Sequence, residues 1–189
     1  HFIEWFSGSD ISSIWTKTNT VGTGTFAMND SVDGGYGITV SGTANNRSSI
    51  NFNNKRQYNQ DACEFIGVVQ AETVGNTMFF GLSSGLDPFT TAGHSGAYYN
   101  NSTGAGAQSF GSCDGTTQSG TAFGTETASW QSIKIALDGT DLKGYVNGTL
   151  QVTKSTNYPI VKMQPIMQIR TYDEATVTAS TRYIEAYNT

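Results

Sequence analysis

Apolar and polar residues alternate most clearly between residues 130 and 152. The apolar positions in the first part of this segment are Ile133, Ile135 and Leu137, and a two-residue period of this kind places them on one face of a strand. Asp138-Gly139 and Asn147-Gly148 then supply turn signals. Asn-Gly is the strongest short hairpin signal, because both residues tolerate the positive φ of a type I′ turn. The segment therefore predicts three consecutive antiparallel strands, at 130–137, 142–147 and 149–153.

The rest of the chain favours strands as well, since no long helical period is present. Only three prolines occur, and turn residues recur about every ten positions, a spacing that is typical of an all-β sandwich. Further strands are expected at 2–6, 25–28, 37–40, 48–53, 62–71, 77–83, 96–100, 107–113, 163–172 and 182–187. We expect the first and the last of these to pair, a short helical turn at 12–15, and long loops at 83–95 and 114–127.

Composition and charge narrow the classes of function. Charged residues make up 13% of the chain, against a usual share of about 25%, and neutral polar residues and glycine take their place. The net charge is −5 and Lys55-Arg56 is the only basic pair, so the basic footprint of nucleic-acid binding is missing. No apolar run approaches the roughly 20 residues of a membrane span. We expect one domain over residues 1–189, located outside the cell or on a virion surface.

Several segments together resemble a known family. The run WQSIKIALDG followed by GYVNG resembles the late core strands of the concanavalin A-like (LamG-like) jelly-roll domain. Residues 3–40 resemble the usual start of that domain, 45–58 and 63–84 its middle strands, and 150–187 its closing pair. The resemblance implies a two-sheet antiparallel jelly-roll sandwich. Such domains serve in sugar binding, adhesion, glycan hydrolysis and virion structure, so the resemblance implies an architecture rather than one activity.

Catalysis is not expected from the arrangement of the carboxylates. Glycoside hydrolysis needs two carboxyl groups that flank the scissile bond, about 5–5.5 Å apart in retaining enzymes. The resemblance to glucanases implies a Glu-x-Asp-x-x-Glu strand, and this chain has no such motif. A polysaccharide lyase would need a combination such as His94, Tyr99 and Arg170, and nothing in the spacing of these residues favours it. We therefore expect that the chain is not an enzyme.

Glycan binding is the clearest candidate activity. In the strand at 163–172, Met167 and Ile169 share the face expected to meet the core. The opposite face then presents an amide, a guanidinium and a phenol, and the expected neighbouring strands add further aromatic and amide groups. The predicted ligand-binding set is Tyr98, Asn100, Gln108, Phe110, Gln168, Arg170 and Tyr172. The alternative is that these residues only cover the outer sheet face or pack against a neighbouring subunit.

Buried aromatic residues and thiols are expected in the core. Trp5, Trp15 and Trp130 are assigned to it because large aromatic side chains dominate the cores of sandwiches. Cys63 and Cys113 are placed in the same sheet and are a candidate disulfide in an oxidising compartment. The alternative is a pair of buried thiols that act as small hydrophobic residues.

The resemblance implies a structural calcium ion as a cofactor, because many sandwiches of this family carry one. Its ligands would be carboxylate and carbonyl oxygens. The candidate loop residues are Asp30, Asp33, Asp87, Asp114 and Asp138. The alternative for each is a turn aspartate that bonds to its own backbone.

Taken together, the sequence predicts a non-catalytic virion-surface or extracellular structural and adhesion module. It would assemble with other copies or other structural subunits and contact glycans, without binding nucleic acid or inserting into a membrane. The alternative function is a carbohydrate-binding module of a secreted polysaccharide-active enzyme, or a diverged glycoside hydrolase or lyase.

Overall fold

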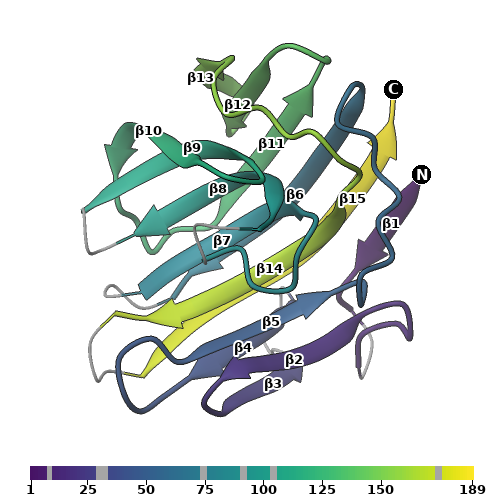
Figure 1. Cartoon of the computed structure of the whole chain (residues 1–189). Helices are drawn as coiled ribbons and strands as arrows, with labels where there is room; N and C mark the ends of the chain where they lie inside the picture. The colour runs from purple at the N-terminus through teal and green to yellow at the C-terminus, as the bar shows by residue number, and fades with distance from the viewer. Residues whose placement is uncertain (8–9, 29–33, 73–75, 90–92, 103–105, 173–175) are drawn as a thin grey trace.

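The computed structural model consists of two antiparallel β-sheets packed face to face (Figure 1). It describes residues 1–7, 10–28, 34–72, 76–89, 93–102, 106–172 and 176–189. Within these residues all regular secondary structure is strand, and no helix is long and apolar enough to cross a membrane. The prediction of an all-β, two-sheet jelly-roll sandwich is therefore confirmed.

The first sheet, called sheet A, has the strand order β13-β12-β11-β6-β15-β4-β3, and β1 also pairs with β15. Its strands are β1 (Phe2–Trp5), β3 (Gly24–Met28), β4 (Tyr36–Val40), β6 (Cys63–Ala71), β11 (Gln131–Leu137), β12 (Leu142–Val146), β13 (Thr149–Lys154) and β15 (Val177–Asn188). The pairing of β1 with β15 brings the two ends of the chain together, as expected from the sequence.

The second sheet, called sheet B, has the order β10-β9-β8-β7-β14-β5-β2. Its strands are β2 (Thr16–Val21), β5 (Arg47–Asn51), β7 (Asn76–Ser83), β8 (Ser95–Ser102), β9 (Ala107–Asp114), β10 (Gln118–Thr125) and β14 (Gln164–Thr171). One face of this sheet packs on sheet A. The opposite face, called the open face of sheet B, carries the candidate site.

The two hairpins predicted from the alternating segment are present. Ile133 lies opposite Val146 in the β11–β12 pair, and both side chains are buried. Asn147 and Gly148 have φ values of 49° and 79°, the left-handed conformation that a type I′ turn requires at both positions. The turn chemistry and the two-residue period therefore agree, and they place the apolar face of β11 toward sheet B.

The core between the sheets depends on close contacts between aromatic rings and glycines. Phe65 of β6 and Phe80 of β7 pack edge to face, with ring centroids 4.9 Å apart. A Cβ atom at Gly67 would lie 2.3 Å from the Phe80 ring, so the ring occupies the space that a side chain would need. Trp15 is buried in the same core, as expected.

Three sequence-based expectations about the fold are wrong. Trp5 is 66% exposed, because β1 is an edge strand whose outward positions face solvent, and Trp130 is only half-buried beneath the Arg182 guanidinium. Cys63 lies in sheet A and Cys113 in sheet B, and both are free buried thiols rather than a disulfide. Strands β2 and β10 were not expected, since their sequences, TKTNTV and QSGTAFGT, lack an apolar alternation.

Candidate functional site

The open face of sheet B is formed by alternate residues of its central strands. Gln168 of β14 lies opposite Phe79 of β7 and Ser49 of β5, and Phe79 in turn lies opposite Asn100 of β8. Arg170 of β14 lies opposite Arg47 of β5. Met167 and Ile169 point to the other side and are completely buried in the core, as the alternation predicted. The amide and guanidinium groups of β14 therefore do lie on the outer face.

Residues 84–89, which follow β7, cross this face and bond to it. The side chains of Gln164 and Gln168 donate through Nε2 to the carbonyl oxygens of Gly85 and Leu86, each at 3.4 Å. Arg47 Nη1 lies 2.6 Å from Asp87 Oδ2, and these two side chains are only 15% and 20% exposed. These three side-chain contacts fix the 84–89 segment to β14 and β5, and Gln168 beneath it is completely buried.

Aromatic rings form the apolar part of the open face. Phe79 and Tyr98 are stacked with their centroids 4.6 Å apart, and Phe89 of the 84–89 segment packs edge to face on Phe79 at 6.1 Å. Tyr98 lies across Gly111, where a Cβ atom would be 2.3 Å from its ring. Burial raises the pKa of Tyr98 to about 12, so its phenol stays protonated and serves as a hydroxyl rather than a base.

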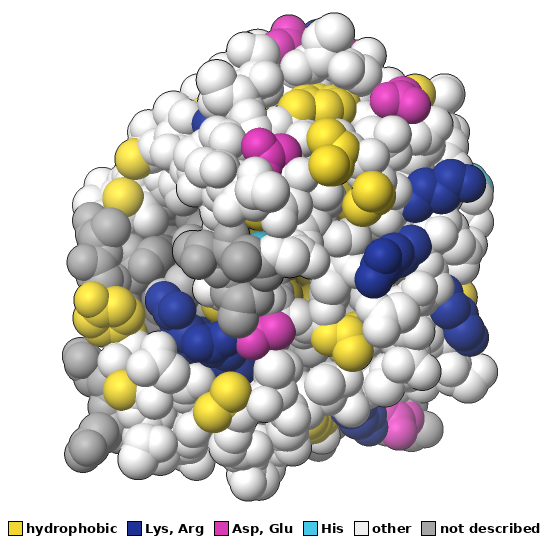
Figure 2. Space-filling view, in the orientation of Figure 1, with side chains coloured by type: hydrophobic (Ala, Val, Ile, Leu, Met, Phe, Trp, Pro, Cys, Tyr) yellow, Lys and Arg dark blue, Asp and Glu magenta, His cyan; other side chains and the backbone are white. Residues whose placement is uncertain are grey.

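Arg170 is the half-buried cation at the edge of this aromatic cluster. Its guanidinium lies 4.9 Å from the centre of the Phe89 ring, a cation–π contact. Burial lowers the pKa of Arg170, and the nearby charge of Arg47 adds to that effect, while Asp87 opposes it. Figure 2 shows Lys and Arg side chains gathered beside an acidic side chain on this face of the molecule. The cluster thus holds two cations next to one another.

Several buried polar atoms on this face have no hydrogen-bond partner among the residues that the structure describes. They are Arg47 Nε, Arg170 Nε, Gln168 Oε1 and Asn100 Oδ1. Two of them are donors and two are acceptors, and buried polar atoms are normally paired. Leaving such an atom unpaired costs about 1–3 kcal/mol, so these four atoms mark the positions on the open face that need a further partner.

The predicted ligand-binding residues divide into two groups. Tyr98, Asn100, Gln168 and Arg170 do share the open face, and Tyr172 is 52% exposed directly after β14. Gln108 and Phe110 were placed on the wrong face. They lie opposite Asn101 and Tyr99, so their side chains point into the sandwich. Phe110 packs on Phe123 and Tyr99, and Gln108 Nε2 donates to the carbonyl oxygen of Thr125 at 2.6 Å. The 84–89 segment lies in the long loop expected at 83–95, but none of its residues was included in the predicted ligand-binding set.

Two of the carboxylates proposed as calcium ligands, Asp114 and Asp138, have partners in their own turns, and Asp87 is paired with Arg47. Asp114 Oδ1 accepts hydrogen bonds from the backbone of Thr116 and Thr117, and Asp138 Oδ1 accepts them from Thr140 and Asp141, all within 3.2 Å. These are Asx turns, the alternative that the sequence analysis left open. Asp30 and Asp33 lie outside the described residues. Within the described ones, no group of three or more His, Cys, Asp or Glu residues could hold a metal ion, so calcium stays a prediction.

The three residues named for a lyase are not brought together. Tyr99 points into the core and its hydroxyl donates to Gln131 Oε1 at 2.6 Å, on the opposite side of the sheet from Arg170. His94 is buried immediately before β8. Successive strand residues face opposite ways, which separates Tyr99 from the open face.

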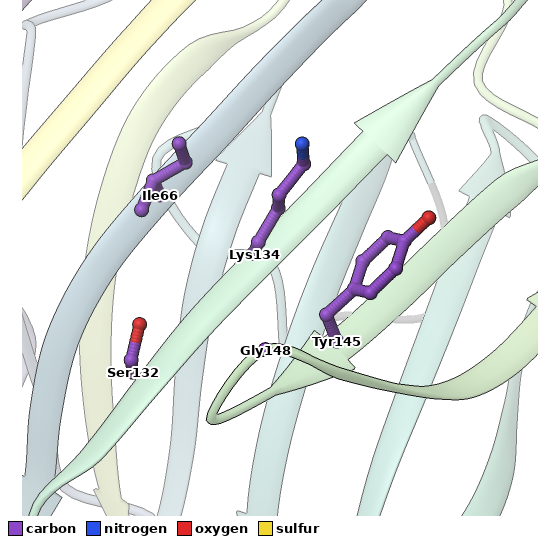
Figure 3. A pocket seen from close by; sticks show the side chains of 5 residues that line it. All are labelled: Ile66, Ser132, Lys134, Tyr145 and Gly148. Atoms are coloured by element: carbon purple, nitrogen blue, oxygen red, sulfur yellow. The ribbon is translucent and has the colours of Figure 1, made fainter.

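A second candidate site lies on the outward face of sheet A. It is a hollow of about 300 Å³ that is lined by Ile66, Ser132, Lys134, Tyr145 and Gly148. Figure 3 shows these residues on their strands. Lys134 Nζ is 2.7 Å from Glu64 Oε1 and 5.6 Å from the centre of the Tyr145 ring. The charged groups of this hollow, Lys134 and Glu64, are thus paired with each other.

Comparisons with known proteins find similarity in structure only. No protein-family model and no curated protein sequence matches the chain. The Bacillus licheniformis β-glucanase matches with a TM-score of 0.73 and 13% identity, over 100% of this chain and 97% of that one. A prokaryotic β-1,3-1,4-glucanase (lichenase) from a mouse hindgut metagenome matches with a TM-score of 0.70 and 14% identity, over 99% of this chain and 98% of that one. The carbohydrate recognition domain of Emp46p matches with a TM-score of 0.64 and 10% identity, over 97% of this chain and 93% of that one.

These matches establish the class of fold. The chain has the concanavalin A-like jelly-roll architecture, as its sequence indicated. They also contradict the expectation that the chain is not an enzyme, because that expectation rested on a missing motif while the architecture is shared with glycoside hydrolases. The activities of these proteins are their own, and identities of 10–14% extend only the fold to this chain.

Proposed function

We propose that this protein binds a glycan on the open face of sheet B, beside Arg170 and Phe89. The observation that carries the proposal is the group of four buried, unpaired polar atoms on Arg47, Arg170, Gln168 and Asn100. A sugar hydroxyl both donates and accepts, so it can serve donors and acceptors alike, directly at the exposed edge of the site or through ordered water at the buried atoms. The similarity to two glucanases and to a carbohydrate recognition domain supports the same chemistry.

The entry point is the exposed side of the 84–89 segment. Arg170 and Phe89 are half-buried there, and Tyr172 is exposed next to them. The face of an aromatic ring carries partial negative charge and attracts the C–H groups on the apolar side of a pyranose. A sugar ring packed on Phe89 would place its hydroxyl groups toward Arg170 and the polar atoms behind it.

Hydrolysis of the bound glycan is a second candidate, favoured by the architecture shared with glucanases. Two carboxyl groups are required, and Asp87 is one that the structure places on this face. Release of reducing ends from β-1,3-1,4-glucan tests this candidate. Product formation by the wild type supports it, and no product at high enzyme concentration rejects it.

The expected setting belongs to the same proposal. A neutral surface rich in Thr and Asn suits a protein outside the cell or on a virion, and contact with other subunits of an assembly remains part of that hypothesis. Sedimentation velocity would test it, because a subunit should form multimers as its concentration rises. A monomer at all concentrations contradicts the assembly role without affecting glycan binding.

The binding site is tested by Arg170→Gln. We expect its affinity for soluble β-1,3-1,4-glucan to fall about tenfold or more, because a charge-assisted hydrogen bond to a half-buried guanidinium is lost. Isothermal titration calorimetry measures the change. Arg56→Gln is the matched control, since it removes the same charge from an exposed position. An equal loss in both variants, or no binding by the wild type, contradicts the proposal.

A further inference from the structure

The hollow on the outward face of sheet A combines apolar and polar groups in one row. Ile66 of β6, Lys134 of β11 and Tyr145 of β12 lie directly opposite one another on three neighbouring strands. Residues paired in this way have Cβ atoms about 4.5–5.5 Å apart, so the three side chains form a continuous strip. Figure 3 shows the Lys134 side chain and the Tyr145 ring rising from the same side of the sheet.

The charged groups of the hollow keep a fixed position. Glu64 accepts hydrogen bonds from Lys134 Nζ and from the Tyr187 hydroxyl. Burial alone would raise the pKa of Glu64, but these two hydrogen bonds and the charge of Lys134 lower it below its usual value. The carboxylate is therefore ionised at neutral pH and holds the ammonium group in place, with its side chain only 19% exposed.

We propose that this hollow is a second glycan-binding site, which holds one neutral sugar ring against Tyr145. The Lys134–Glu64 pair has no net charge, so it selects for a neutral ligand rather than an ion. Lys134 keeps free donor positions and Glu64 keeps free acceptor positions, which match the hydroxyl groups of a sugar. Ile66 and the Tyr145 ring supply the apolar surface for the C–H face of the ring, and Ser132 adds a hydroxyl at the edge.

The size of the hollow agrees with this ligand. Its volume of about 300 Å³ is at the lower limit of ligand pockets, which measure about 300–1,000 Å³. It therefore suits a sugar ring, while a large cofactor would not fit. The proposal rests on the proposed function in one respect, because the ligand is the same glycan.

Two sites on opposite sheets would change what the protein does to a polysaccharide. The open face of sheet B and the outward face of sheet A point away from each other, so one short segment of glycan cannot reach both. Separate chains or distant segments could occupy them together. The protein would then cross-link polysaccharide chains. Where both sites bind the same polymer, the two weak contacts together would hold it more tightly than either site alone.

The test is an NMR titration with a β-1,3-1,4-linked gluco-tetrasaccharide, in which the amide signals of each sheet face measure binding at that face separately. We expect the amide signals of Lys134 and Tyr145 to shift together with those of Gln168 and Arg170. In Tyr145→Ala the apparent affinity at the sheet A residues should fall about three- to tenfold, while the sheet B residues keep theirs. Lys134→Gln should act in the same direction and provides a second variant if Tyr145→Ala folds poorly.

Tyr183→Ala is the matched control, because Tyr183 is a half-buried tyrosine on the same face, on β15 and three strands away from β12. It should leave both affinities unchanged. Absence of shifts at Lys134 and Tyr145 in the wild type overturns the second site, as do unchanged shifts in both variants. Shifts at the sheet A residues without any at Gln168 and Arg170 would instead overturn the proposed function and retain the second site.

Discussion

Phe110→Ala should lower the free energy of unfolding by about 3–5 kcal/mol, the usual cost of removing a fully buried phenylalanine. The ring is completely buried between the sheets. It is stacked on Phe123 at 5.2 Å, and it covers Gly144 so closely that a Cβ atom there would lie 2.3 Å from the ring. Alanine would leave a cavity that the two sheets cannot close. Urea denaturation followed by tryptophan fluorescence measures the change.

The same variant decides between the two roles considered for Phe110. If Phe110 is a core residue, its replacement should lower the free energy of unfolding and leave the glycan affinity of the folded protein unchanged. Phe123→Ala is the control. Phe123 is only half-buried on the edge strand β10, so this substitution should lower the free energy of unfolding clearly less than Phe110→Ala. If Phe110→Ala costs no more than Phe123→Ala and weakens glycan binding instead, the inward placement of Phe110 is wrong.

Asp87→Asn should lower the free energy of unfolding by roughly 2–4 kcal/mol, because it leaves the largely buried Arg47 guanidinium without its carboxylate. The two side chains come from segments 40 positions apart, so their ion pair ties the 84–89 segment to β5. We also expect faster hydrogen exchange at residues 84–89 in this variant, since one of three attachments to the sheet is lost.

Asp61→Asn is the matched control for this prediction. Asp61 is exposed before β6, and the same substitution there should leave the free energy of unfolding nearly unchanged. Unchanged stability and unchanged exchange at residues 84–89 in Asp87→Asn would show that the ion pair does not hold the segment on the open face.

Local patterns predicted the fold wherever apolar alternation and turn chemistry agreed. The β11–β12–β13 hairpins and the inward face of β14 follow from a two-residue period and from Asn147-Gly148. Strand β9 shows where such reasoning stops. Gln108 and Phe110 were assigned to the face of Tyr98, but the register of β8 with β9 places them opposite Asn101 and Tyr99. Register between strands depends on tertiary packing, and a shift by one residue exchanges the faces.

The candidate site was predictable only in part for the same reason. The position of Gln168 and Arg170 on the outer face follows from the alternation along β14. The ion pair of Arg47 with Asp87 and the packing of Phe89 on Phe79 join segments that are distant or irregular, and loops carry no periodic signal. The unpaired atoms on Arg47 and Asn100 become visible only when all strands are in place.

A crystal structure with a β-1,3-1,4-gluco-tetrasaccharide tests the central claim most directly. We expect a sugar ring packed on Phe89, with hydroxyl groups bonded to the Arg170 guanidinium and linked through ordered water to at least one of Gln168 Oε1 and Asn100 Oδ1. If the open face of sheet B holds only ordered waters on these atoms at saturating oligosaccharide, the assignment of the glycan site to this face is contradicted.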